Sequence, residues 1–130
     1  MHMSRARFRW AAVLAGMAML APAVPARADG PVGAYLLTVI PQNGPATTRT
    51  LWCDPDGGAH GAASRACDQL EAAGGEVGRV PARPEPCTLE HAPVTVIANG
   101  VWRGTARHFA RTYPNRCIAV RATGGIIFGE

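Results

Sequence analysis

The chain has 130 residues, 48% of them hydrophobic and 17% charged, a size that suits one domain with a modest core. Its formal net charge of +4 comes from 13 basic residues, all of them arginines, against 9 acidic ones. Four of the arginines and none of the acids lie in the first 28 residues, so the rest of the chain is formally neutral. The net charge of the chain therefore does not indicate a protein that binds nucleic acid or a membrane surface.

The N-terminus has the layout of a secretory signal peptide. Arg5, Arg7 and Arg9 precede an apolar run over residues 11–23, and small residues stand at positions 26 and 28. The run is too short to span a bilayer comfortably, and a small-x-small pattern after such a run is typical of signal cleavage. We expect residues 1–28 to be a signal peptide and residues 29–130 to be a secreted, extracellular domain without membrane association.

The first half of that domain predicts two strands and a helix. Strand-like residues 34–40 end at Pro41, and residues 48–53 form a second β-rich segment after the turn signal Asn43-Gly44-Pro45. These two segments predict an antiparallel pair. Apolar residues then recur at helical spacing over residues 62–73, and Gly74-Gly75 ends the predicted helix.

The second half predicts a hairpin, a short helix and a last strand. Asn99-Gly100 between two apolar runs is the preferred type I′ turn signal, so residues 94–98 and 101–113 are expected to pair across it. Residues 114–120 predict a short helical turn, and residues 126–128 predict a final strand. This order favours an α+β domain: an antiparallel five-stranded sheet with one longer and one short helix packed on one face.

Four cysteines lie in the domain that export would expose to oxidising conditions: Cys53, Cys67, Cys87 and Cys117. Three pairings are possible, and proximity in the sequence favours Cys53–Cys67 and Cys87–Cys117. A zinc site made of Cys53, His60 and Cys67 does not fit the usual ligand spacing. We expect no metal and no cofactor.

The segment between Pro84 and Pro93 has two interpretations of about equal weight. Prolines restrict the backbone at both ends of the segment, and a disulfide at Cys87 would restrain the short run of residues 88–90. In one interpretation the segment is a stiff, extended loop that presents Leu89, which a protease cleft would accept. In the other it is a plain connector whose leucine folds back onto the domain.

Two motifs resemble the signature of the Streptomyces subtilisin inhibitor family: Cys53-x-Pro55-x-x-Gly58-x-His60 and Ala66-Cys67-Asp68-x-Leu70. The likeness extends over nearly all of the domain, through residues 35–39, 92–96, 99–104, 115–117 and 127–128. Three positions depart from the family pattern: Gly61, His91 and Arg116.

The resemblance implies a sheet-plus-helices fold, the two local disulfides, and a homodimer formed through a sheet face. It also implies that the loop is a reactive site whose Leu89 fills the primary pocket of a serine protease, with Leu89–Glu90 as the scissile bond. Further loop contacts would come from Pro86, Cys87, Thr88 and His91. From its own chemistry, Asn115 either braces the loop backbone through its amide or is a turn residue before Cys117. The expected function is reversible, substrate-like inhibition of subtilisin-like endopeptidases, with chymotrypsin-like enzymes as further partners.

Two other classes of protein are weighed against this one. An enzyme with a catalytic His60 or His108 would need a nucleophile motif, and Ser64, the one serine after residue 28, lies in a predicted helix without the Gly-x-Ser-x-Gly context. The other is a secreted binding or structural protein that keeps the scaffold without strong inhibition. His60 is favoured as a structural hydrogen-bonding group, and Trp52 and Trp102 as core or dimer-interface residues.

Overall fold

A computed structural model describes residues 15–22 and 30–129 of the chain. The arginines at 5, 7 and 9 and the small residues at 26 and 28, which carry the signal-peptide prediction, lie outside these ranges. Four strands, β1 (Gly33–Pro41), β2 (Thr47–Cys53), β3 (Val94–Trp102) and β4 (Thr105–Tyr113), form one antiparallel sheet in the order β2-β1-β3-β4. No helix within the described ranges is long and apolar enough to cross a membrane.

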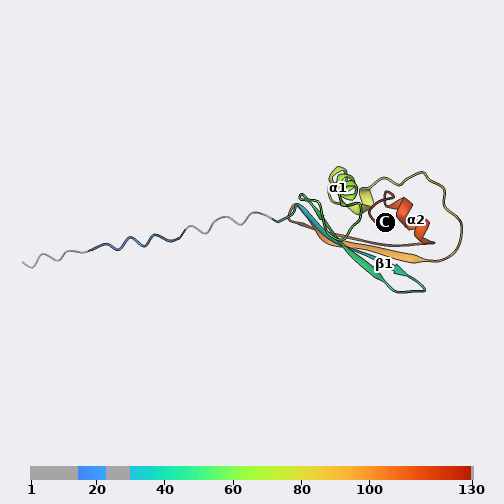
Figure 1. Cartoon of the computed structure of the whole chain (residues 1–130), viewed down its shortest axis with the longest axis horizontal. Coiled ribbons are helices and arrows are strands. Elements are labelled where there is room, and N and C mark those ends of the chain that lie inside the picture. The colour runs from blue at the N-terminus through green and yellow to red at the C-terminus, as the bar shows by residue number, and fades with distance from the viewer. Residues whose placement is uncertain (1–14, 23–29, 130) are drawn as a thin grey trace, which may run out of the picture.

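Two helices, α1 (Ala63–Ala72) and α2 (Arg116–Ala122), and a short 3-10 turn (Val77–Arg79) lie on one side of the sheet (Figure 1). The sheet residues that face them alternate with exposed ones, as a strand covered on one face requires. On β1 the buried residues are Tyr35, Leu37 and Val39, and on β3 they are Val94, Val96 and Ala98. The prediction of an α+β domain with one longer and one short helix on one face is confirmed.

The predicted turn at Asn99-Gly100 is wrong. Strand β3 runs straight through both residues, and the chain reverses at Arg103-Gly104, where φ is 47° and 78°. Gly100 is needed instead for a close approach to β1, because a Cβ there would lie 2.1 Å from the Ala34 carbonyl oxygen. Cross-strand packing in the sheet therefore overrides the local turn preference of Asn-Gly.

The fifth strand predicted over residues 126–128 is also absent from the described part of the chain. Gly124 and Gly125, with φ of 97° and 84°, turn the backbone before it can extend. The three apolar side chains after them fill the core: Ile126, Ile127 and Phe128 are 8%, 0% and 1% exposed. The prediction of a final strand over residues 126–128 is therefore wrong, and the segment is a turn whose side chains complete the core.

His60 satisfies the backbone of that segment. Its ring is buried, and Nδ1 accepts a hydrogen bond from the Ala62 amide at 2.9 Å, so the proton is on Nε2. Nε2 lies 3.1 Å from the Ile126 carbonyl oxygen and 3.0 Å from that of Ile127. His60 therefore has the structural role that the sequence favours.

The disulfides join Cys53 to Cys67 and Cys87 to Cys117, so both predicted pairs are confirmed. The first bridge fastens α1 to the end of β2. The second fastens the segment before β3 to the first turn of α2. Since no thiolate remains on Cys53 or Cys67, the nearby Asp56 does not complete a metal site with them.

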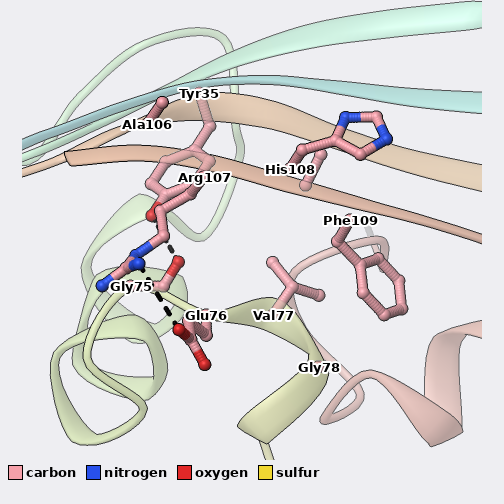
Figure 2. Close-up of a pocket in the computed structure, with 10 residues that line it drawn as sticks. Tyr35, Gly75, Glu76, Val77, Gly78, Ala106, Arg107, His108 and Phe109 are labelled. Atoms are coloured by element: carbon pink, nitrogen blue, oxygen red, sulfur yellow. Dashed lines mark hydrogen bonds and ion pairs between the residues drawn. The ribbon is translucent and has the colours of Figure 1, made fainter.

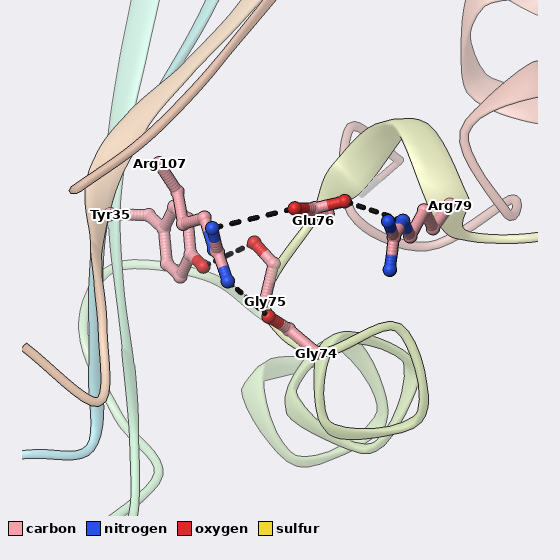
Figure 3. Close-up of polar contacts among 6 residues, drawn as sticks. All are labelled: Tyr35, Gly74, Gly75, Glu76, Arg79 and Arg107. Carbon is pink, nitrogen blue, oxygen red and sulfur yellow. Dashed lines mark hydrogen bonds and ion pairs between the residues drawn. The ribbon is translucent and has the colours of Figure 1, made fainter. Parts of the chain in front are cut away.

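The segment after α1 is held to the sheet by a cluster of polar contacts (Figure 3). The Tyr35 hydroxyl donates to the Gly75 carbonyl at 2.6 Å, and the Arg107 guanidinium donates to the Gly74 carbonyl at 3.3 Å. Glu76 lies between two arginines, 3.4 Å from Arg107 and 2.6 Å from Arg79. Four residues of this cluster, Tyr35, Gly75, Glu76 and Arg107, line a pocket of about 280 Å³ between β4 and the 3-10 turn (Figure 2). Because these polar groups pair with one another, apart from the buried Nε of Arg107, we interpret the cluster as structural.

Tyr35 should make the stability depend on pH in the alkaline range. Burial raises the pKa of Tyr35 from 10.0 to about 12, which Arg107 opposes and Glu76 reinforces. Between these two values the unfolded chain has lost the phenolic proton and the folded chain keeps it, so the contribution of Tyr35 to the free energy of unfolding should be constant below pH 10 and fall as the pH rises towards about 12. Denaturant unfolding across this range should show the fall, and Tyr35→Phe should abolish it. The same fall in the variant would contradict the assignment to Tyr35.

The other face of the sheet carries exposed apolar side chains. Leu36, Ile40, Trp52 and Val101 are 51%, 38%, 48% and 44% exposed. Trp52 and Val101 flank Ala34 in the pairing register, so this apolar surface crosses β2, β1 and β3. We call it the open face.

Candidate functional site

Residues 81–93 form an irregular loop between the 3-10 turn and β3, and it arches over α2 (Figure 1). Prolines at positions 81, 84, 86 and 93 restrict its backbone and exclude helix. The side chain of Leu89 is 93% exposed. The interpretation in which this leucine folds back onto the domain is therefore wrong, and an apolar side chain stands in solvent on a stiff loop.

One segment of the chain, residues 114–121, holds most of this loop. The Ala92 amide donates to the Pro114 carbonyl at 2.9 Å, and the Cys87–Cys117 disulfide fixes the loop two residues before Leu89. Further back, the Arg121 guanidinium donates to the Glu85 carbonyl at 3.1 Å. The loop is thus fastened on both sides of Leu89 to α2 and the residues that lead into it.

Asn115 braces the centre of the loop. It is 1% exposed, and its Nδ2 donates to the carbonyl oxygens of Thr88 and Glu90, each at 3.0 Å. Its Oδ1 accepts from the Ile118 amide at 2.9 Å and caps α2. The cap fixes which way the amide points, so both Nδ2 hydrogens face the loop. One side chain therefore sets the backbone on either side of Leu89 and starts the helix that carries it.

The other predicted loop residues surround this centre. Pro86, Thr88, Glu90 and His91 are exposed, and Cys87 is half-buried. The loop therefore offers an almost continuous accessible edge from residue 86 to residue 91, with its backbone held from below.

The two histidines considered as catalytic do not join this site. Both ring nitrogens of His60 contact backbone groups in the core. His108 lies on β4 and contacts Asn99 on the open face of the sheet.

A groove of about 670 Å³ borders the loop on the side of α2. Its charged lining residues are Arg65, Arg83, Arg116, Arg121, Glu85 and Glu90. No motif predicts this gathering, because the four arginines come from α1, the loop and α2 and meet only in the folded chain. Arg116, which departs from the family pattern, and Glu90, which follows the proposed scissile position, both line it.

Comparison with known proteins gives a consistent result. The subtilisin inhibitor-like family matches residues 35–115. A subtilase-type protease inhibitor of Streptomyces coelicolor is 37% identical over 129 residues, which covers 85% of this chain and 89% of the relative. A Streptomyces avermitilis relative is 38% identical over 79 residues, and there the match spans 61% of this chain but only 53% of the relative.

A solved structure has the same fold. Streptomyces caespitosus sermetstatin, crystallised in complex with Bacillus licheniformis subtilisin, superposes with a TM-score of 0.55 and 32% identity, over 70% of this chain and 91% of that one.

Proposed function

This chain belongs to the subtilisin inhibitor-like family, and from that premise we propose that it is a secreted, substrate-like, reversible inhibitor of subtilisin-like serine endopeptidases. The observation that carries the proposal is Leu89, 93% exposed between two carbonyls that Asn115 holds. A fully solvated leucine does not stabilise the fold. Its apolar surface contributes a favourable free energy only when a partner buries it.

Binding starts from a loop that already has its bound shape. Fixing a residue's backbone costs about 1–2 kcal/mol, and here the disulfide, the prolines and Asn115 meet that cost during folding. The extended residues 86–88 pair with the protease cleft as an added strand. Leu89 then enters the primary pocket, where burial contributes about 1.5–3 kcal/mol.

The same contacts explain why a bound protease would hydrolyse the Leu89–Glu90 bond only slowly. Attack by the protease serine on the Leu89 carbonyl carbon would form an acyl-enzyme and release the Glu90 amine. Hydrogen bonds from Asn115 hold the Thr88 and Glu90 carbonyls, and the Cys87–Cys117 bridge holds the acyl side. The amine therefore stays beside the acyl carbon, and re-formation of the Leu89–Glu90 bond competes with hydrolysis.

The chemistry of Leu89 sets the range of targets. Subtilisin-like and chymotrypsin-like enzymes have apolar primary pockets, whereas trypsin places a carboxylate there that leucine does not pair with. Inhibition acts without metal or cofactor, and the protein itself is not an enzyme.

The test is a titration of purified residues 29–130 against subtilisin, chymotrypsin and trypsin. Subtilisin activity should fall linearly to near zero at a fixed molar ratio, chymotrypsin should be inhibited more weakly, and trypsin least. Unchanged subtilisin activity with an intact, folded protein would favour the scaffold-keeping binding protein instead.

We further propose a homodimer through the open face, which its exposed Leu36, Trp52 and Val101 support. Sedimentation equilibrium at micromolar concentration should give twice the monomer mass. Val101→Glu should give the monomer mass, because it places a carboxylate within the interface. Leu89→Glu, which adds the same charge at an exposed apolar position off the sheet, should remain dimeric. A wild-type protein that stays monomeric would refute the dimer.

A further inference from the structure

The charges of the domain are unevenly distributed. Of the nine arginines after residue 28, four line the groove beside the loop, against two of the nine acids. Four other acids gather around the Cys53–Cys67 disulfide: Asp54, Asp56, Asp68 and Glu71. Cys53 pairs with Gly33 at one end of the sheet, whereas the loop enters β3 at the other end, beside the pair of Val94 and Tyr113. Nine-residue strands place these ends roughly 27–30 Å apart. A domain with no net charge is thus positive at its loop end and negative at the far end.

The groove keeps its positive excess. Elsewhere Arg79, Arg103 and Arg107 form ion pairs with glutamates, which cancel their charge. In the groove, Arg121 and Arg83 donate to backbone carbonyls, of Glu85 and Gly124, and a carbonyl leaves the cation formally uncompensated. Apolar lining groups, the Cys87–Cys117 bridge with Val120 and Ile126, lie beside the guanidiniums. A concave surface with such walls concentrates the electrostatic field.

We propose that this groove is an electrostatic docking surface for a target protease whose cleft is rimmed by carboxylates. The inference rests on the proposed function of the loop. Cys87 and Glu90 belong both to the loop and to the groove, so a protease seated on Leu89 meets the groove at its edge. A typical interface covers about 800 Å² on each partner, more than one loop supplies, and the field extends about 8 Å at physiological ionic strength.

The groove also answers a difficulty at the scissile bond. Glu90 follows Leu89 directly, and its carboxylate loses water when a protease closes over the loop, which is costly for an uncompensated charge. Four guanidiniums around the same groove offset that cost. The groove thus attracts acidic partners and makes an acidic residue tolerable after the scissile bond.

The test is the rate constant for association with subtilisin, measured by stopped flow from about 10 mM to about 1 M ionic strength, where the screening length falls from about 30 to about 3 Å. The probes are native subtilisin and subtilisin whose lysines have been succinylated, which makes its surface more acidic. At low ionic strength, Arg65→Gln combined with Arg116→Gln should slow association with the succinylated enzyme about 3- to 10-fold, and less with the native enzyme. The difference should vanish at high salt, and the dissociation rate should change less than about twofold.

The matched control is Arg103→Gln, which removes one positive charge at the far end of the sheet, with Arg65→Gln as its single-charge counterpart. Unfolding curves should confirm that each variant is folded. Equal slowing by Arg103→Gln and Arg65→Gln, or a double variant that matches the wild type at every ionic strength, would overturn the docking surface while leaving inhibition intact. A wild-type protein that does not inhibit subtilisin would instead refute the proposed function, and the groove inference with it.

Discussion

Replacing Leu89 with glycine should raise the inhibition constant for subtilisin about 100-fold, while the free energy of unfolding falls by no more than about 1 kcal/mol, the cost of ordering a glycine backbone. Lost burial of the leucine accounts for about 1.5–3 kcal/mol, and the looser glycine backbone for about 0.5–1 kcal/mol more. The fold should be nearly unaffected, because the side chain is 93% exposed. Inhibition assays and denaturant titrations on the same preparations measure both quantities.

Leu89→Lys is the matched variant for specificity. The lysine cation suits the carboxylate in the trypsin pocket, so trypsin inhibition should strengthen as subtilisin inhibition weakens. If Leu89→Gly left subtilisin inhibition unchanged, the reactive bond would lie elsewhere on the molecule.

The second large effect is expected at Asn115. Asn115→Asp keeps a good helix cap, because a carboxylate oxygen can still accept from the Ile118 amide. It removes both donors, however, and turns acceptor oxygens towards the carbonyls of Thr88 and Glu90. The loop centre should loosen, so that subtilisin cleaves Leu89–Glu90 and regains its activity over time. Mass spectrometry of the mixture should show accumulation of the cut chain.

Asn115→Ala is the control, because it removes the cap and the donors together. Both variants should become substrates, but they lose stability for different reasons: alanine loses the cap, which costs about 0.5–2 kcal/mol, whereas aspartate keeps the cap and buries a carboxylate against two carbonyl oxygens. Permanent inhibition by Asn115→Asp would show that the disulfide alone keeps the loop in shape, and would contradict the bracing role.

The strands and the disulfides were predictable because their signals are local and repeated. Runs of apolar and β-branched residues mark β1 and β3, and short separations favour the cysteine pairs. The turn and the last strand were mispredicted because tertiary contacts determine the backbone conformation of both segments. Gly100 serves a close approach to Ala34, which no local pattern at Asn99-Gly100 reveals. Residues 126–128 look like a strand, yet two glycines turn the chain and His60, some 66 residues away in sequence, meets their carbonyls.

In the candidate site, too, some residues could be predicted from local patterns and others depend on tertiary contacts. Leu89 and Asn115 could be named from the sequence because each stands at a fixed distance from a cysteine. That Asn115 caps α2 with one atom and holds the loop with another depends on the geometry at the start of that helix. The groove could not be predicted, since Arg65, Arg83, Arg116 and Arg121 span two helices and a loop and share no periodicity.

The near-complete exposure of Leu89 has a consequence for how such a protein changes over generations. A substitution at a buried residue such as Asn115 is exposed to selection for folding before any target is met. A substitution at Leu89 is nearly neutral for folding, since the folded domain does not depend on its side chain. If Leu89 is the specificity residue that we propose, one copy after a gene duplication can exchange its protease for another through a single codon while the scaffold stays the same.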